Sequence, residues 1–124
     1  MLQNDFFYFT ALQTEGNVAK TVLEINAAHQ IFKGHFPGNP VVPGVCMMQM
    51  VKEVLEELIE AKTRLLKAGD MKFLAVINPG VHRFVDLDIT HSIDNGNIKV
   101  DAVIQKDGTI FFKLKGLFSK NEAV

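Results

Sequence analysis

Residues 34–62 read GHFPGNPVVPGVCMMQMVKEVLEELIEAK, and this stretch decides the fold. Its pattern changes at Pro43, where closely spaced prolines give way to apolar residues at steps of three and four. Proline suits the first turn of a helix, because its missing N–H is not needed there. The spacing therefore predicts a helix that begins at Pro43 and runs to about Lys62. The apolar residues of one face are Val45, Met48, Val51, Leu55, Leu58 and Ile59.

The predicted helix has two different halves. No charged residue occurs between Val45 and Val51, whereas the second half is rich in charge. A helical segment that is apolar on every face is normally buried on every side. We therefore expect the first half to lie inside the protein and the charged residues, Glu53 among them, to face solvent. The charged residues are Lys52, Glu53, Glu56, Glu57 and Glu60.

Two strand patterns precede the helix. Residues 6–13 and 18–25 are rich in apolar side chains and are separated by the turn residues Glu15, Gly16 and Asn17, so they predict a hairpin. Residues 26–43 contain three of the four prolines and predict a structured loop rather than a regular element.

Strand patterns also follow the helix. Tight turns predicted at Asn95-Gly96 and Asp107-Gly108 join the last three strands into a meander. One helix among antiparallel strands indicates an α+β fold in which the sheet wraps around the helix. The four predicted strands span residues 71–77, 84–90, 98–105 and 109–119.

Composition narrows the class of protein. With 124 residues, 48% hydrophobic and 22% charged, the chain predicts one globular domain over residues 1–124. Cys46 is the only cysteine, which excludes an internal disulfide and a multi-cysteine zinc site and favours a cytoplasmic location. The net charge of -1 gives no nucleic-acid footprint, and the longest apolar run, residues 73–77, is too short to cross a membrane.

The loop before the helix carries the candidate chemistry. Prolines at 37, 40 and 43 restrict the backbone on both sides of themselves, so His35 is expected to be held with little freedom. Gly44 and Val45 follow at the helix N-terminus, where backbone N–H groups lack intrahelical partners and the helix dipole is positive. A histidine beside such donors suits a reaction that develops an oxyanion.

The run GHFPGNPVVPGV, residues 34–45, resembles the H-F-P-x-x-P-x-x-P-G signature of the 3-hydroxyacyl-acyl-carrier-protein dehydratases, and the order of elements fits that family over nearly the whole chain. The resemblance implies the hot-dog fold and a homodimer, often a trimer of dimers, with acyl tunnels between subunits. It also implies a substrate carried on the phosphopantetheine arm of acyl carrier protein. That chemistry requires no cofactor and no metal.

The resemblance also implies roles for single residues. His35 matches the histidine that takes the proton next to the thioester, and the N–H of Gly44 matches the donor that holds the thioester oxygen. The family's helix carboxylate, which acts from the partner subunit, falls at Gln49. Flanking positions are expected to contact the substrate, and these are Phe36, Pro37, Pro43, Val45 and Met48.

Gln49 departs from the family pattern, because an amide cannot transfer a proton at physiological pH. Loss of a general acid usually costs on the order of 10²- to 10⁴-fold in rate. Several interpretations stay open: His35 acts as both base and acid, Glu53 replaces the lost carboxylate, or the fold serves as an acyl thioesterase. A further alternative is a non-catalytic subunit that binds the acyl carrier.

Overall fold

The computed structural model describes residues 1–34 and 40–120. Within them the chain forms two helices and seven strands. The strands before the long helix are short, and the four after it span ten to twelve residues each. The elements are β1 (Phe7–Phe9), β2 (Gln13–Glu15), β3 (Val18–Ile25), α1 (Ile31–Gly34), α2 (Gly44–Ile59), β4 (Thr63–Phe73), β5 (Phe84–Asp94), β6 (Asn97–Lys106) and β7 (Thr109–Lys120).

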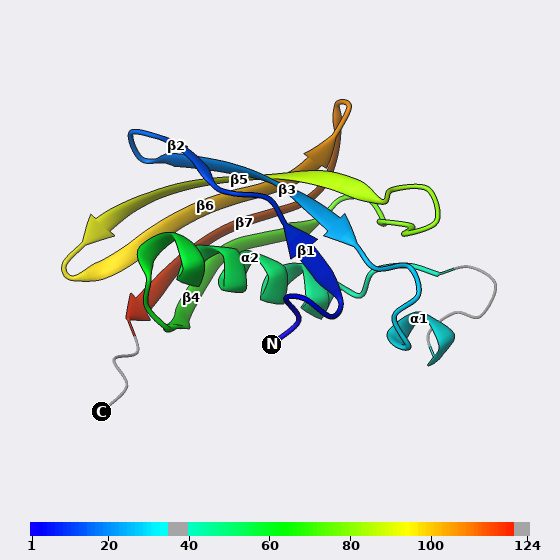
Figure 1. Ribbon diagram of the computed structural model, residues 1–124. Coiled ribbons are helices and arrows are strands. Elements are labelled where there is room, and N and C mark those ends of the chain that lie inside the picture. The colour runs from blue at the N-terminus through cyan, green and yellow to red at the C-terminus, as the bar shows by residue number, and fades with distance from the viewer. Residues whose placement is uncertain (35–39, 121–124) are drawn as a thin grey trace.

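All strands join one antiparallel sheet that curves over α2 (Figure 1). The strand order is β1-β3-β5-β6-β7-β4, and β2 pairs with β3 beside β1. Strands β5, β6 and β7 form the predicted meander, with Asn95-Gly96 and Asp107-Gly108 at positive φ in its two turns. The predicted α+β arrangement, an antiparallel sheet around one helix, is confirmed.

The core lies between the sheet and the helix. Alternate residues of β5 and β6 point inward, and Leu87 and Ile104 are fully buried. From α2, Met50, Val54 and Leu55 are fully buried against them. Burying one such side chain stabilises the fold by roughly 1.5–3 kcal/mol. The second half of the helix therefore belongs to the core, despite its glutamates.

The first strand after the helix differs from its prediction. The sequence predicts 71–77, whereas β4 spans Thr63–Phe73 and the chain leaves the sheet at Leu74. The register of β4 against β7 shifts twice, between Leu65 and Lys67 and between Ala68 and Asp70. Each irregularity breaks the two-residue alternation that marks a strand. For this reason the pattern of residues 63–70 does not predict the strand they form.

Three other boundaries also need correction. Helix α2 begins at Gly44 with Pro43 as its N-cap, and it ends at Ile59 because Glu60 adopts a left-handed conformation with φ 55°. The predicted loop 26–43 contains the short helix α1. The predicted strand 6–13 is split into β1 and β2. No helix in residues 1–34 or 40–120 is long and apolar enough to span a membrane.

Candidate active site

The predicted site residues fall into two groups. His35, Phe36 and Pro37 lie outside the described residues, so their roles stay predictions. The remaining predicted residues share the N-cap and the first two turns of α2, so the helix brings them together at its N-terminal end, which lies near β1 (Figure 1). They are Pro43, Gly44, Val45, Met48 and Gln49.

The first turn of α2 offers backbone donors. The carbonyl oxygen of Pro43 accepts hydrogen bonds from Cys46 N at 3.0 Å and Met47 N at 3.2 Å. Gly44 and Val45 come before these donors in the chain, and their own N–H groups have no hydrogen-bond partner within residues 1–34 and 40–120. Because the helix dipole is positive here, the two N–H groups can stabilise an oxyanion.

Phe73 packs directly against Gly44. A Cβ added at Gly44 would lie 2.8 Å from Cε1 of Phe73, so a larger residue would displace the ring. The ring also packs on Phe112 in a tilted arrangement, with 5.0 Å between centroids and 33° between the ring planes, and remains 52% exposed. Because position 44 has no side chain, the Phe73 ring can lie close to the first turn of α2.

Exposed apolar side chains lie near this helix end, both on α2 and on the segment from Phe73, which contacts Gly44, to Ile77, whose carbonyl accepts from Val42 N. Val45 is 76% exposed, which contradicts the prediction that the first half of the helix is buried on every side. Leu74 and Val76, which follow Phe73, are also exposed. The sheet covers only one side of the helix, so Cys46 and the neighbouring core residues are buried while Val45 is not.

Gln49 and Glu53 form a hydrogen-bonded pair on α2. Gln49 Nε2 donates to Glu53 Oε2 at 2.9 Å. The backbone N–H of Leu2 donates to both Glu53 oxygens, at 2.8 and 3.0 Å, and that of Gln3 donates to Oε1 at 2.8 Å. Glu53 is only 3% exposed, so the prediction that it faces solvent is wrong. The buried carboxylate is satisfied by donors from half-buried residues, as a buried charge requires.

This arrangement restricts the chemistry of both side chains. Both oxygens of Glu53 already accept hydrogen bonds, and a proton on either would oppose a donor. Glu53 is therefore poorly suited to replace a catalytic acid. Gln49 uses its Nε2 toward Glu53, while its Oε1 has no partner among the described residues and is not buried.

Sequence patterns reveal only part of this pair. The four-residue spacing of Gln49 and Glu53 places them on the same helix face, and that spacing predicts contact. The backbone donors of Leu2 and Gln3 lie 50 or more residues away in sequence, and backbone groups leave no residue-type signal. Burial of Glu53 depends on them, so it was not predictable.

Cys46 lies in the first turn but behaves as a core residue. It is 4% exposed, and burial raises the pKa of its thiol above the ordinary value. A reactive cysteine needs the opposite shift, toward a lower pKa. Its place in the first turn does not make it a nucleophile.

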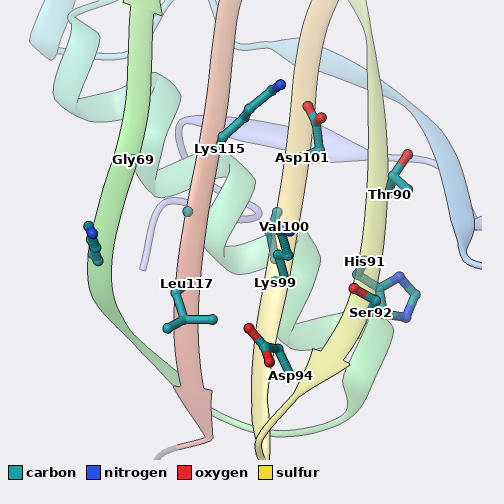
Figure 2. Close-up of a pocket in the computed structure, with 12 residues that line it drawn as sticks. Gly69, Thr90, His91, Ser92, Asp94, Lys99, Val100, Asp101, Lys115 and Leu117 are labelled. Carbon is teal, nitrogen blue, oxygen red and sulfur yellow. The ribbon is translucent and has the colours of Figure 1, made fainter.

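A separate hollow lies on the face of the sheet away from α2 (Figure 2). It encloses about 650 Å³. Thr90, Asp101 and Lys115 lie side by side across β5, β6 and β7, so charges of both signs line it. Of the predicted site residues that the structure describes, none lines this hollow. The described residues contain no group of three or more His, Cys, Asp or Glu arranged to hold a metal ion.

Comparisons with known proteins agree with the motif. The family model described as "ApeI-like: ApeI dehydratase" matches residues 11–113. The 3-hydroxyacyl-[acyl-carrier-protein] dehydratase FabZ of Caldicellulosiruptor bescii is 30% identical over 112 residues, covering 85% of this chain and 79% of the relative. FabZ of Caldicellulosiruptor saccharolyticus is 34% identical over 114 residues, covering 82% of this chain and 81% of the relative.

A solved structure supports the same fold. The dehydratase heterocomplex ApeI:P from Xenorhabdus doucetiae contains a chain that superposes with a TM-score of 0.72 at 18% identity, covering 90% of this chain and 96% of that chain. The hot-dog fold predicted from the sequence is confirmed. With a family model spanning residues 11–113 and two relatives similar over most of their length, this chain belongs to the ApeI-like family of hot-dog dehydratases.

Proposed function

We propose that this protein removes water from 3-hydroxyacyl thioesters to give trans-2-enoyl thioesters, with the acyl chain carried on acyl carrier protein. The observation that carries the proposal is the open first turn of α2. There the N–H of Gly44 has no partner among the described residues, the position of its missing Cβ faces Phe73, and Gly44 belongs to the same motif as His35. Membership of a dehydratase family supports the reaction type.

The proposed mechanism uses one base and one oxyanion donor. His35 takes the proton from C2 of the substrate, and the electron pair of that bond moves toward the thioester carbonyl, whose oxygen is held by the Gly44 N–H. The electrons then return to form the C2–C3 double bond while the C3–O bond breaks. The leaving oxygen takes the proton from the His35 imidazolium, which releases water and restores neutral His35.

Gln49 takes the place of the usual carboxylate in this scheme. Its amide binds the 3-hydroxyl but transfers no proton, so His35 must serve as base and then as acid. The remaining predicted contacts, from Phe36, Pro37 and the helix residue Met48, hold the acyl chain or its pantetheine arm. No cofactor or metal enters the reaction.

We propose that a second copy of this chain completes the site, with His35 and Gly44 from one copy and Gln49 from the other. Two features support this partner. The apolar surface formed by Val45, Leu74 and Val76 lies beside the first turn of α2, and apolar surface of this kind marks interaction sites. Strand β4 lies at the end of the sheet and pairs only with β7 among the described strands.

The test is hydration and dehydration of 2-enoyl and 3-hydroxyacyl thioesters on acyl carrier protein, with thiol release recorded in the same samples. We expect turnover in wild type and a loss of 10²- to 10⁴-fold in His35→Ala. His91→Ala is the matched control, because its Nδ1 is buried without a partner in the described residues, so truncation breaks no hydrogen bond at that atom.

Other outcomes would redirect the proposal. Thiol release without dehydration would identify an acyl thioesterase. Carrier binding without turnover would identify a non-catalytic subunit. Native mass spectrometry of the purified protein tests the second copy, and a stable monomer that becomes active only with a homologous subunit would replace the homodimer by a heteromer.

A further inference from the structure

Among the described residues of α2, Glu53 is the only buried carboxylate, and it accepts four hydrogen bonds. Three come from the backbone N–H groups of Leu2 and Gln3, and the fourth comes from the side chain of Gln49. An ionised carboxylate accepts and never donates, so the atom of Gln49 that faces it must be Nε2. The orientation of the Gln49 amide is thereby fixed.

The position of Gln49 determines which way its other atom points. Along this face of α2, Val45 is 76% exposed, Gln49 is half-buried and Glu53 is 3% exposed. Leu2 and Gln3 donate their backbone N–H groups to Glu53, and among the described residues no hydrogen bond joins them to Gln49 or Val45. Gln49 thus lies between the buried Glu53 and the exposed Val45, with Nε2 on Glu53 and with an Oε1 that is not buried.

We infer that Glu53 is a positioning residue: it holds the amide of Gln49 so that the site presents a carbonyl oxygen, an acceptor, to the substrate hydroxyl. The inference rests on the proposed function. A hydroxyl that donates its hydrogen to Gln49 Oε1 keeps its lone pairs free for the proton from His35. An amide turned the other way would donate to those lone pairs and compete with that proton.

The contact between Gln49 and Glu53 also determines which substitutions could restore a carboxylate at position 49. Gln49→Glu alone places a second carboxylate at hydrogen-bond distance from Glu53, where the two groups repel each other and neither can donate a hydrogen bond to the other. The hollow of about 330 Å³ beside Glu53 adds further acidic groups. Its lining residues besides Glu53 are Met1, Gln3, Glu56, Glu57, Glu60, Ala61 and Lys62. Only the exchange Gln49→Glu with Glu53→Gln keeps one amide and one carboxylate in contact.

The first measurement is side-chain amide exchange in ¹⁵N-labelled protein, which does not depend on activity. The Gln49 NH₂ signal, assigned by its loss in Gln49→Glu, should be protected from exchange relative to the exposed Gln13 and Gln30. In Glu53→Gln the new amide must accept from Leu2 and Gln3, so Gln49 turns over and its NH₂ loses protection. Equal protection in both proteins, or exchange as fast as that of Gln13 in wild type, overturns the inference.

The second measurement is turnover. Glu53→Gln should lower kcat by at least about tenfold with little change in KM, because binding survives while the hydroxyl meets the wrong group. The exchanged pair should regain wild-type kcat or exceed it. Glu57→Gln, exposed on the same helix, is the matched control. A kcat in Glu53→Gln equal to that of the control overturns the positioning role.

The two failures can be told apart. If Gln49 shows the expected exchange but wild type dehydrates no thioester, the proposed reaction is overturned while the hydrogen-bonded pair stands. Thermal unfolding gives an independent check on the pair. The Tm of Gln49→Glu should lie below that of wild type, because two carboxylates at hydrogen-bond distance repel each other, and the exchanged pair should show no such loss. An equal Tm for all three proteins contradicts the contact.

Discussion

Each half of α2 contains a residue whose burial is opposite to the composition of that half. The first half, residues 44–51, contains no charge, yet it includes Val45, the most exposed residue of the apolar surface beside the site. The second half, residues 52–59, contains four charged residues, yet it includes the buried Glu53 beside the core residue Leu55. Polarity alone therefore does not decide burial along this helix, because the segments that cover each half also matter.

The difference follows from what each half must do. The second half is covered on one side by the sheet and on the other by residues 1–3, and the N–H groups of Leu2 and Gln3 make burial of a carboxylate tolerable. The first half is left open on one side, where Val45 adjoins backbone donors without a described partner. Rigid packing in one half thus supports an accessible site in the other.

The largest expected effect contrasts Leu55→Ala with Val45→Ala. Leu55 is fully buried in the core, so truncation should cost about 2–5 kcal/mol of unfolding free energy. Val45 is 76% exposed, and its truncation should change stability by no more than about 0.5 kcal/mol. Urea unfolding of the two variants measures both. Equal losses would mean that the first half is covered to the same degree as the second.

A smaller effect is expected for Glu53→Ala. This change leaves the N–H groups of Leu2 and Gln3 and the amide of Gln49 without their acceptor, at a cost of about 1–3 kcal/mol for each group that stays buried. Glu57→Ala, on an exposed residue one turn further, should stay within about 0.5 kcal/mol. Chemical denaturation of both variants measures the two losses of unfolding free energy. A neutral Glu53→Ala would show that solvent replaces the carboxylate.

The sequence predicts the parts of this architecture that depend on residue type. Asn95-Gly96 and Asp107-Gly108 predict the meander because their positive φ needs those residues, and the apolar steps predict α2 to within a few residues. Strand β4 escapes prediction because two register shifts hide its alternation. For the candidate site, the motif predicts the place of Gly44 and Gln49, while Glu53 escapes because its donors are backbone groups distant in sequence.

The contact between Phe73 and the first half of α2 can be tested at Gly44. In Gly44→Ala the new Cβ would meet Cε1 of Phe73 at 2.8 Å, so the ring must move. The contact involves the far end of a half-exposed side chain, so we expect a stability change of at most about 1 kcal/mol but a clear loss of turnover. The double variant Gly44→Ala with Phe73→Ala is the control for the clash. If the single variant keeps full turnover, the contact of Phe73 with Gly44 has no part in the site.

The smallest effect concerns Cys46, the buried thiol of the open half. Burial raises its pKa in the folded protein, whereas the unfolded chain has an ordinary thiol that ionises near pH 8.5. As the pH rises past that value, only the unfolded state loses the proton, so stability falls until the folded thiol ionises too. Between about pH 7 and 10 the free energy of unfolding should therefore fall slightly more steeply with pH for wild type than for Cys46→Ala. Identical slopes, together with alkylation of Cys46 as fast in native as in urea-unfolded protein, would mean that the first turn opens enough for water to reach the thiol.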